Sequence, residues 1–306
     1  NEPNGFRRIT YFLDRFDSLS TYTTRIEADK NTYPVLLANG NKKNSGDLAD
    51  GRHYIVWEDP IPKNPNIFAM VAGDLAMVED TFTTMSGRSV ILQTYVDKGN
   101  EERVGHTMDA LKKAMLFDEQ YFKREYDLDY YLIVAVDAFN FSAMENKGLN
   151  IFNSKAALAS PTTASDSDFQ TVEVVVVHEY LHNWTGNRIS CRDPFQMTLK
   201  EGLTVFRDQR YSETTFSESL ERIRQVQVLR NAQFPEDAGP TAHPIRPASI
   251  GTAHNIYTTT VYKKGAEVIR MIETLLGKDL FNEGLQHYFD KYDGKATCTE
   301  NFLQCM

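Results

Sequence analysis

The sequence predicts an α+β fold, with strands gathered toward the N-terminal end and helices in the C-terminal half. Three observations support this fold class. The first third of the 306 residues is rich in β-branched and aromatic residues between turn clusters. The middle combines one long helical pattern with short apolar runs of strand length. Beyond the polar loop Ser160 to Asp168, the chain reads as mostly helical.

The first third holds most of the expected strands. We predict them at Arg8 to Leu13, Thr23 to Ala28, His53 to Trp57, Phe68 to Val71 and Val90 to Val96. Clusters such as Asn39-Gly40-Asn41 and Asn44-Ser45-Gly46-Asp47 predict turns between strands. Pro60, Pro62 and Pro65 lie in one connection, which we expect to be irregular because proline lacks the backbone N–H donor.

The middle of the chain changes from one period to another. A helix is predicted over Arg103 to Tyr126, because apolar residues recur there at helical spacing. These residues are Met108, Leu111, Met115 and Phe122. A buried strand is expected at Tyr131 to Val136, and a further strand near Leu149 to Phe152.

Composition argues against some classes of partner. The net charge is -9 and the pI is near 5.3, whereas nucleic-acid binding needs a basic surface. No apolar run is long enough to span a membrane, and no signal-peptide pattern is visible. Three cysteines without CxxC spacing favour a reducing, cytoplasmic location. We therefore expect no nucleic acid and no membrane as partner, and a monomer.

One short segment carries a catalytic motif. His178-Glu179-Tyr180-Leu181-His182 fits the H-E-x-x-H pattern of zinc peptidases. Ser167 and Gln170 predict a capped helix start, and Gly186 predicts the stop. The β-branched run Val174 to Val177 instead favours a strand. We predict a helix, because positions i and i+4 share a helix face and both imidazoles can then reach one ion. The alternative is a helix with two surface histidines and a solvated glutamate.

A third zinc ligand is expected in Leu199-Lys200-Glu201-Gly202. Glu201 lies 19 positions after His182 on the next predicted helix. A hairpin of two helices can return its carboxylate to the metal. Catalytic zinc takes three protein ligands and leaves one position for water. Taken alone, Glu201 would more often be a solvated helix residue.

These residue types predict hydrolysis by a zinc-activated water. Zinc lowers the pKa of bound water toward ~7. Glu179 is too close along the helix to be a ligand beside both histidines, but it can act as general base and pass the proton to the leaving amine. A tyrosine hydroxyl is the usual second donor to the oxyanion, and Tyr257 and Tyr262 are both candidates on these grounds.

Longer stretches resemble a known family. His178, His182 and Glu201 follow the gluzincin spacing, and FSAMENKG at Phe141 to Gly148 resembles the G-A-M-E-N exopeptidase motif. Supporting stretches are EPNGFRRITYFLDR, HNWTGNRISCRD, LKEGLTVFRDQ and TVYKKGAEVIRM. The chain resembles the aminopeptidase N family over nearly its whole length, and is most similar to its bacterial-type (alanyl aminopeptidase) branch.

The resemblance implies a zinc-dependent aminopeptidase that removes the N-terminal residue of peptides. It implies one Zn²⁺ held at the positions of His178, His182 and Glu201, with Glu179 as the general base. Tyr262 is the tyrosine that it implies for stabilising the tetrahedral intermediate.

The resemblance also implies how a free α-amine is recognised. Glu145 and Glu2 are the two acids implied to bind the substrate's α-ammonium. Two such carboxylates discriminate against blocked amines, because the acids would be left buried and unpaired. The neighbouring residues implied in substrate binding are Phe141, Ser142, Ala143, Met144 and Asn146.

The implied architecture has two domains. Residues 1–74 form the C-terminal part of a β-rich domain, and residues 75–306 form a thermolysin-like catalytic domain with a mixed sheet. The family continues with further domains, so a chain truncated at both ends is expected.

The chain departs from the family pattern at a few positions. Ser142 replaces a glycine, Phe141 a residue that is typically methionine, and Val177 a small residue before the zinc motif. Lys263 replaces a glutamate beside the implied catalytic tyrosine. No catalytic group is lost. The alternative to an active enzyme is a catalytically weak or silent peptide-binding relative.

Overall fold

A computed structural model describes residues 5–251 and 253–306, which form two compact units. One unit comprises residues 20–63 and 67–183. The other comprises residues 64–66 and 184–306, together with the described residues before Ser20. The succession of sheets and helices confirms the α+β class, and the domain boundary at residues 74/75 stays a prediction. Among the described residues, no helix combines the length and apolar character needed to cross a bilayer.

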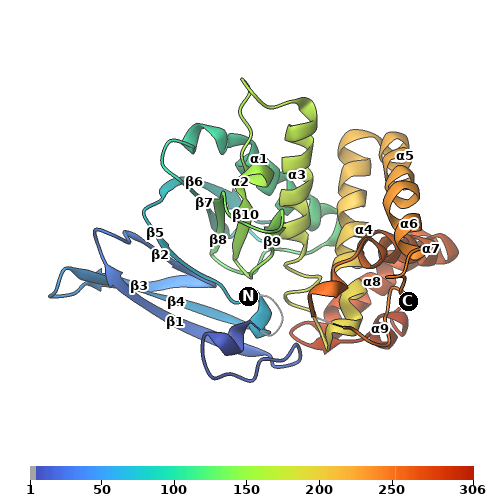
Figure 1. Ribbon diagram of the computed structural model, residues 1–306, viewed down its shortest axis with the longest axis horizontal. Coiled ribbons are helices and arrows are strands. Elements are labelled where there is room, and N and C mark those ends of the chain that lie inside the picture. The colour runs from blue at the N-terminus through green and yellow to red at the C-terminus, as the bar shows by residue number, and fades with distance from the viewer. Residues whose placement is uncertain (1–4, 252) are drawn as a thin grey trace. The chain divides into compact units, whose positions relative to one another are not determined.

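The first unit contains the mixed sheet that the resemblance implied (Figure 1). Its strand order is β6-β7-β8-β10-β9, with β7, β8 and β10 parallel and the two outer pairs antiparallel. The strands are β6 Ala76–Thr83, β7 Ser89–Val96, β8 Tyr130–Val136, β9 Ala143–Met144 and β10 Leu149–Asn153. The interior of β8 is buried throughout, as expected for a parallel strand covered on both faces.

Helices pack beside this sheet. They are α1 Gly105–Phe117, α2 Ser154–Ala157 and α3 Asp166–Leu181. Helix α1 packs against α3, and α2 contacts α3 and β10 (Figure 1). A π-helical turn, Asp118–Phe122, continues α1, and the four apolar residues that predicted this helix are all buried. The predicted helix and both predicted middle strands are therefore confirmed, although the helical segment starts two residues later and ends four residues earlier than predicted.

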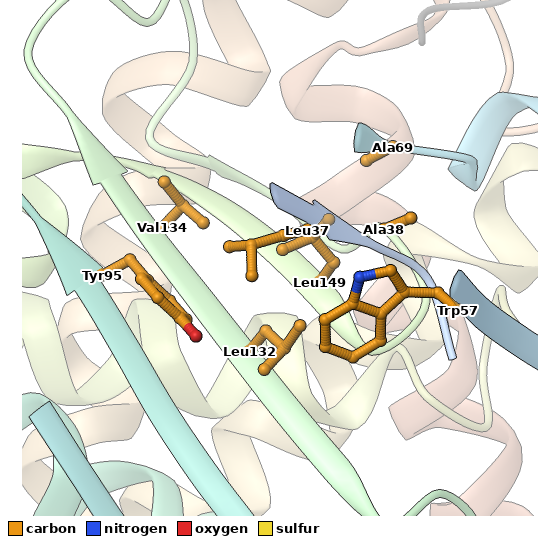
Figure 2. Close-up of a cluster of buried hydrophobic side chains, with 8 residues drawn as sticks. All are labelled: Leu37, Ala38, Trp57, Ala69, Tyr95, Leu132, Val134 and Leu149. Carbon is orange, nitrogen blue, oxygen red and sulfur yellow. The ribbon is translucent and has the colours of Figure 1, made fainter. Parts of the chain in front are cut away.

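Two smaller sheets complete the unit. The order β1-β4-β3 is antiparallel, and β2 pairs antiparallel with β5. Their bounds are β1 Ser20–Asp29, β2 Val35–Ala38, β3 Asn41–Asp47, β4 Arg52–Lys63 and β5 Met70–Gly73. Leu37 and Trp57 from these sheets meet Leu132, Val134 and Leu149 of the five-stranded sheet in one apolar core (Figure 2).

Three expectations for the first third of the chain are wrong. Arg8 to Leu13 is not a strand: Phe6–Arg8 is a 3-10 helix, and Arg7 donates from its backbone N and its Nε to the Asp14 carboxylate, both at 3.1 Å. These local bonds close the segment on itself, against its β propensity.

The turn expected at residues 44–47 lies within β3, and the irregular connection expected at the prolines is largely strand. The exposed strand β3 tolerates polar residues. Its pairing with β4 stops at Glu58, so Pro60 and Pro62 need no N–H donor on that side. Strands β2, β3 and β6 were not predicted. β6 is an edge strand with alternating, partly exposed residues, which weakens its apolar signal.

The second unit is mostly helical, which confirms the expectation for the C-terminal half. Its helices are α4 Glu201–Ser212, α5 Glu218–Val228, α6 Phe234–Asp237, α7 Gly265–Leu276, α8 Lys278–Tyr292 and α9 Thr299–Leu303. A parallel pair, β11 Ser190–Cys191 and β12 Ala296–Thr297, joins the two ends of the unit's long C-terminal segment. Large apolar side chains such as Phe206, Phe281 and Phe289 form its interior.

Candidate active site

The H-E-x-x-H motif lies at the end of helix α3, as predicted. The helix begins after Ser165, which forms a capping box with Asp168, so the start predicted at Ser167 with Gln170 is wrong by two residues. The Asp168 carboxylate accepts from the Ser165 backbone N at 2.8 Å, and the Asp168 backbone N donates to Ser165 Oγ at 3.3 Å, which satisfies one N–H of the first turn. The helix ends at Leu181, before the stop predicted at Gly186. The valine run does not break α3, because burial outweighs its strand propensity.

The two histidines of the motif face each other. The Nε2 atoms of His178 and His182 are 3.0 Å apart, and the ring planes meet at 89°. Two nitrogens on one tetrahedral zinc, each at ~2.0–2.1 Å, lie about 3.3 Å apart. The helix spacing therefore brings the imidazoles together as predicted, and the pair fits two positions around one ion.

Two acids join this pair within the same unit. Ligand-type atoms of Glu145, Glu179 and His182 all lie within 4.8 Å of one another, and all three side chains are buried. Burial raises the pKa of Tyr131 well above its usual value, and the nearby charges of Glu179 and Glu145 raise it further. Tyr131 therefore stays a neutral phenol at this site. We call Glu145, Glu179 and His182 the acid cluster.

The segment resembling the exopeptidase motif reaches the acid cluster through a short strand. Ala143 and Met144 form β9, which pairs antiparallel with β10. The Ser142 carbonyl accepts from the Asn153 backbone N at 2.9 Å, which fixes the strand's start. Asn146 is buried, and its carbonyl accepts from the Leu149 backbone N at 2.9 Å. Glu145 thus leaves the sheet edge between two anchored positions, while Phe141 is 44% exposed.

Three further polar residues near the acid cluster were not predicted. The buried ammonium of Lys147 contacts the Asp127 carboxylate and donates to Asn183 Oδ1 at 2.6 Å. Lys147 could have been noticed in the sequence, because it is the charged residue that follows Glu145 within the stretch FSAMENKG. Asn183 lies in the stretch HNWTGNRISCRD, directly after His182, but nothing local to Asn183 or to Asp127 predicts that they meet Lys147.

Glu201 belongs to the other unit, where it is the first residue of α4. Glu201 is 2% exposed, and its carboxylate lies 3.1 Å from the Lys200 ammonium. The connection to α4 is not the simple hairpin expected, because β11 and a 3-10 helix, Pro194–Leu199, intervene. Thr185 and Thr204 join their hydroxyls at 2.6 Å. These residues stand three positions after His182 and Glu201 respectively, so the bond holds the chain after the zinc motif against α4.

The two tyrosine candidates also lie in this unit. Tyr262 is in a π-helical turn, Thr260–Lys264, and Tyr257 precedes it. Both are partly buried and pack against one cluster of Met197, Ile256 and Val261. The packing leaves the choice between them open. Glu2 lies outside the described residues.

Comparison with known proteins decides the family. Residues 106–306 match the model of the peptidase family M1 domain. The chain belongs to peptidase family M1. The proteins that it resembles include aminopeptidase N of Haemophilus influenzae, 57% identical, and aminopeptidase N of Escherichia coli, 56% identical. Each comparison covers 100% of this chain and 35% of the relative, so the chain spans about a third of the relatives' length.

A solved structure shares the fold. The crystal structure of Legionella pneumophila aminopeptidase A in complex with aspartic acid matches with a TM-score of 0.91 at 35% identity. The match covers 98% of this chain and 34% of that one. The resemblance stated from the motifs is therefore confirmed at the level of the family.

Proposed function

We propose that this chain carries the catalytic centre of a zinc-dependent aminopeptidase. The observation that carries the proposal is the acid cluster. It places the glutamate of the exopeptidase motif, Glu145, beside Glu179 and His182 of the H-E-x-x-H motif, in one buried site. An endopeptidase centre needs a metal and a base but has no use for this additional carboxylate. The names of the M1 relatives point the same way.

The donor set suits one zinc ion. We propose His178, His182 and Glu201 as its ligands, since two imidazoles and a carboxylate are a common set for catalytic zinc. The 3.0 Å separation of the imidazole nitrogens supports this assignment. When bound, zinc supplies a Lewis acid that polarises the substrate carbonyl and lowers the pKa of water.

The chain's own residues move the proton and stabilise the charge. Glu179 takes the proton of the attacking water and delivers it to the leaving amine, so the carboxylate ends the cycle as it began. Tyr262 donates its hydroxyl hydrogen to the developing oxyanion. Burial of Glu179 excludes bulk water from this exchange.

Recognition of the free amine falls to the remaining acids. We propose that Glu145, together with Glu2, accepts hydrogen bonds from the substrate's α-ammonium. The backbone around β9 lies along the peptide, with Ala143, Met144 and Asn146 as contacts and with Phe141 and Ser142 shaping the pocket for the first side chain. An acetylated nitrogen carries no charge and offers fewer donors to Glu145 than an ammonium does, and this weaker interaction disfavours blocked peptides.

The proposal also covers the cellular location and the oligomeric state. Cys191, Cys298 and Cys305 are not disulfide-bonded, which supports a reducing, cytoplasmic location. We propose a peptide with a free N-terminus as the partner, bound by a monomer.

The test compares an aminoacyl fluorogenic amide with its N-acetyl derivative, before and after chelation and zinc add-back. We expect only the free amine to be cut, with activity lost on chelation and restored by zinc. Glu145→Ala should lower kcat/KM for the free amine at least about 30-fold. Glu119→Ala removes another buried acid of the same unit, bonded to the Met85 backbone, and should spare this selectivity. Equal cleavage of both compounds would contradict the proposal.

A further inference from the structure

A buried lysine ties the two segments of the acid cluster together. Lys147 stands two residues after Glu145, and Asn183 directly follows His182. The Lys147 ammonium donates to Asn183 Oδ1 at 2.6 Å and contacts the Asp127 carboxylate, while Asn183 Nδ2 donates to Asp127 at 3.4 Å. Three segments that are far apart in sequence therefore meet at one network.

The backbone of Lys147 is held as firmly as its side chain. Its N donates to the Ile67 carbonyl at 3.3 Å, and its carbonyl accepts from Asn39 Nδ2 at 2.7 Å. Asn39 also accepts from the Ala69 backbone N at 2.7 Å. Lys147 thus links the sheet region to the end of α3. A shift of this residue would break hydrogen bonds of its backbone and of its side chain.

Burial makes this arrangement demanding. Lys147 is 0% exposed, and removing an ammonium from water is unfavourable unless oxygen acceptors surround it. An apolar side chain of similar length would fill the same space without that requirement. The polar network, unlike an apolar side chain, connects two specific segments: the segment that contains Glu145 and the residue after His182.

We propose that Lys147 is a positioning residue that sets where Glu145 lies relative to the zinc-binding end of α3. The distance between the bound ammonium and the reacting carbonyl of a substrate is fixed by the peptide itself, at one residue. Glu145 must match that distance, because misplacement by about 1 Å is enough to lose on the order of 100-fold in rate. This inference rests on the proposed function.

The test separates positioning from stability with a matched pair of ligands. Phenylalanine hydroxamate carries an α-amine, and 3-phenylpropanohydroxamate lacks only that amine. Calorimetry on the zinc-loaded chain gives both dissociation constants. We divide the constant of the amine-free compound by that of phenylalanine hydroxamate, so that a larger ratio means stronger binding of the amine. Lys147→Met should reduce this ratio about tenfold or more while the affinity for the amine-free compound stays within about twofold.

Lys63→Met is the matched control. Lys63 is also 0% exposed and pairs with an aspartate, Asp59, at 2.9 Å in the same unit. Its ion pair lies within its own strand, and the charge of Lys147 acts on Lys63 through space, so this variant removes a neighbouring buried cation and keeps the contact of Lys147 with Asn183. The loss of Lys63 should lower the melting temperature and change the ratio less than about twofold. If Lys147→Met lowers the melting temperature but leaves the ratio at the wild-type value, Lys147 is structural only and the proposal fails.

A second variant keeps the proposal testable if Lys147→Met does not fold. Asn183→Ala removes one acceptor and leaves the ion pair with Asp127, and it should also reduce the ratio; an unchanged ratio would overturn the assignment. Wild-type behaviour separates the two hypotheses. A wild-type chain that binds both hydroxamates equally and cuts no free-amine substrate would overturn the proposed function, and the positioning role with it.

Discussion

Two clusters of charged residues within the described part of the chain differ in the kinds of charge that they bring together. The first is the acid cluster, where two glutamates and a histidine converge. The second lies in the helical unit, where arginines and glutamates alternate. Its members are Arg210, Glu213, Arg270 and Glu273. We call the second group the ion-pair network.

The network satisfies its own charges. Arg210 contacts both Glu213 and Glu273, and Arg270 Nη2 lies 2.8 Å from Glu213 Oε1. It ties α4 and its continuation to α7 without an outside ligand. The acid cluster instead gathers two carboxylates in a buried place, an arrangement that attracts a metal ion or an ammonium. Burial of charge alone therefore does not identify a functional site.

The largest expected effect is on catalysis and comes from the acid cluster. Glu179→Gln keeps the shape of the side chain but removes its ability to accept a proton. We expect kcat to fall about 10²- to 10⁴-fold, with the melting temperature unchanged or raised, because one of two neighbouring buried carboxylates is neutralised. Steady-state kinetics with a free-amine substrate and a thermal melt measure both quantities.

Glu173→Gln is the control on the same helix. Glu173 is 3% exposed, lies six residues before Glu179 in α3, and pairs with Lys113 at 2.9 Å. It should lose stability and keep kcat. A Glu179→Gln variant with wild-type kcat would break the contrast between the two clusters, since its acid would then be structural too.

The ion-pair network should show the opposite behaviour. Arg210→Met leaves Glu213 and Glu273 buried without one of their cations, and we expect a loss of about 3–5 kcal/mol in the free energy of unfolding. Activity per folded molecule should stay within about twofold. Urea denaturation followed by fluorescence measures the first quantity. Arg224→Met is the exposed counterpart, since Arg224 is 45% exposed and pairs with Glu221 three residues earlier; it should cost at most about 1 kcal/mol.

The contrast also shows what the sequence could predict. The motif helix, its two histidines and Glu179 followed from local spacing, and the structure places them as spacing requires. The ion-pair network and the Lys147 network did not, because their partners are more than 50 residues apart in several cases and no local pattern encodes them. The prediction at the prolines of β4 was wrong for a related reason. Whether a strand accepts a proline depends on which neighbouring strand pairs with that position, and this is decided by the tertiary structure.

A third buried charge gives a pH-dependent test. Burial lowers the pKa of Lys63 from 10.5 to about 8; the Asp59 charge opposes this shift, and the Lys147 charge adds to it. Between these values the unfolded chain binds more protons than the folded one, so the free energy of unfolding should rise with pH across this window. The shift changes the free energy of unfolding by about 3 kcal/mol in total. This stability is fully present above pH 10.5 and is lost as pH falls from 10.5 through 8. Denaturation at pH 7.5, 9 and 10.5 measures the slope.

Lys63→Met removes the titrating group and supplies the reference for that slope. The difference between the two proteins should grow in favour of the wild type as pH rises. A difference that is flat or falls with pH would show that folding does not lower the pKa of Lys63, so that the ammonium stays protonated across this window in both states.

The smallest effect concerns the backbone that carries the acid cluster. Gly148 adopts a φ of +70°, and an added Cβ would lie 2.8 Å from Leu128 Cδ1. Gly148→Ala should therefore cost about 1–2 kcal/mol for the left-handed conformation, plus the adjustment of Leu128. Gly87→Ala isolates the first part, because Gly87 has a φ of +86° with nothing within 4 Å of the added carbon. If Gly148→Ala lowers kcat/KM for free-amine substrates beyond the loss of folded protein, and Gly87→Ala does not, the position of Glu145 depends on the chain that follows it. Equal effects of both variants would mean that the acid cluster tolerates movement of this segment, unlike a site whose geometry must match one residue of a peptide.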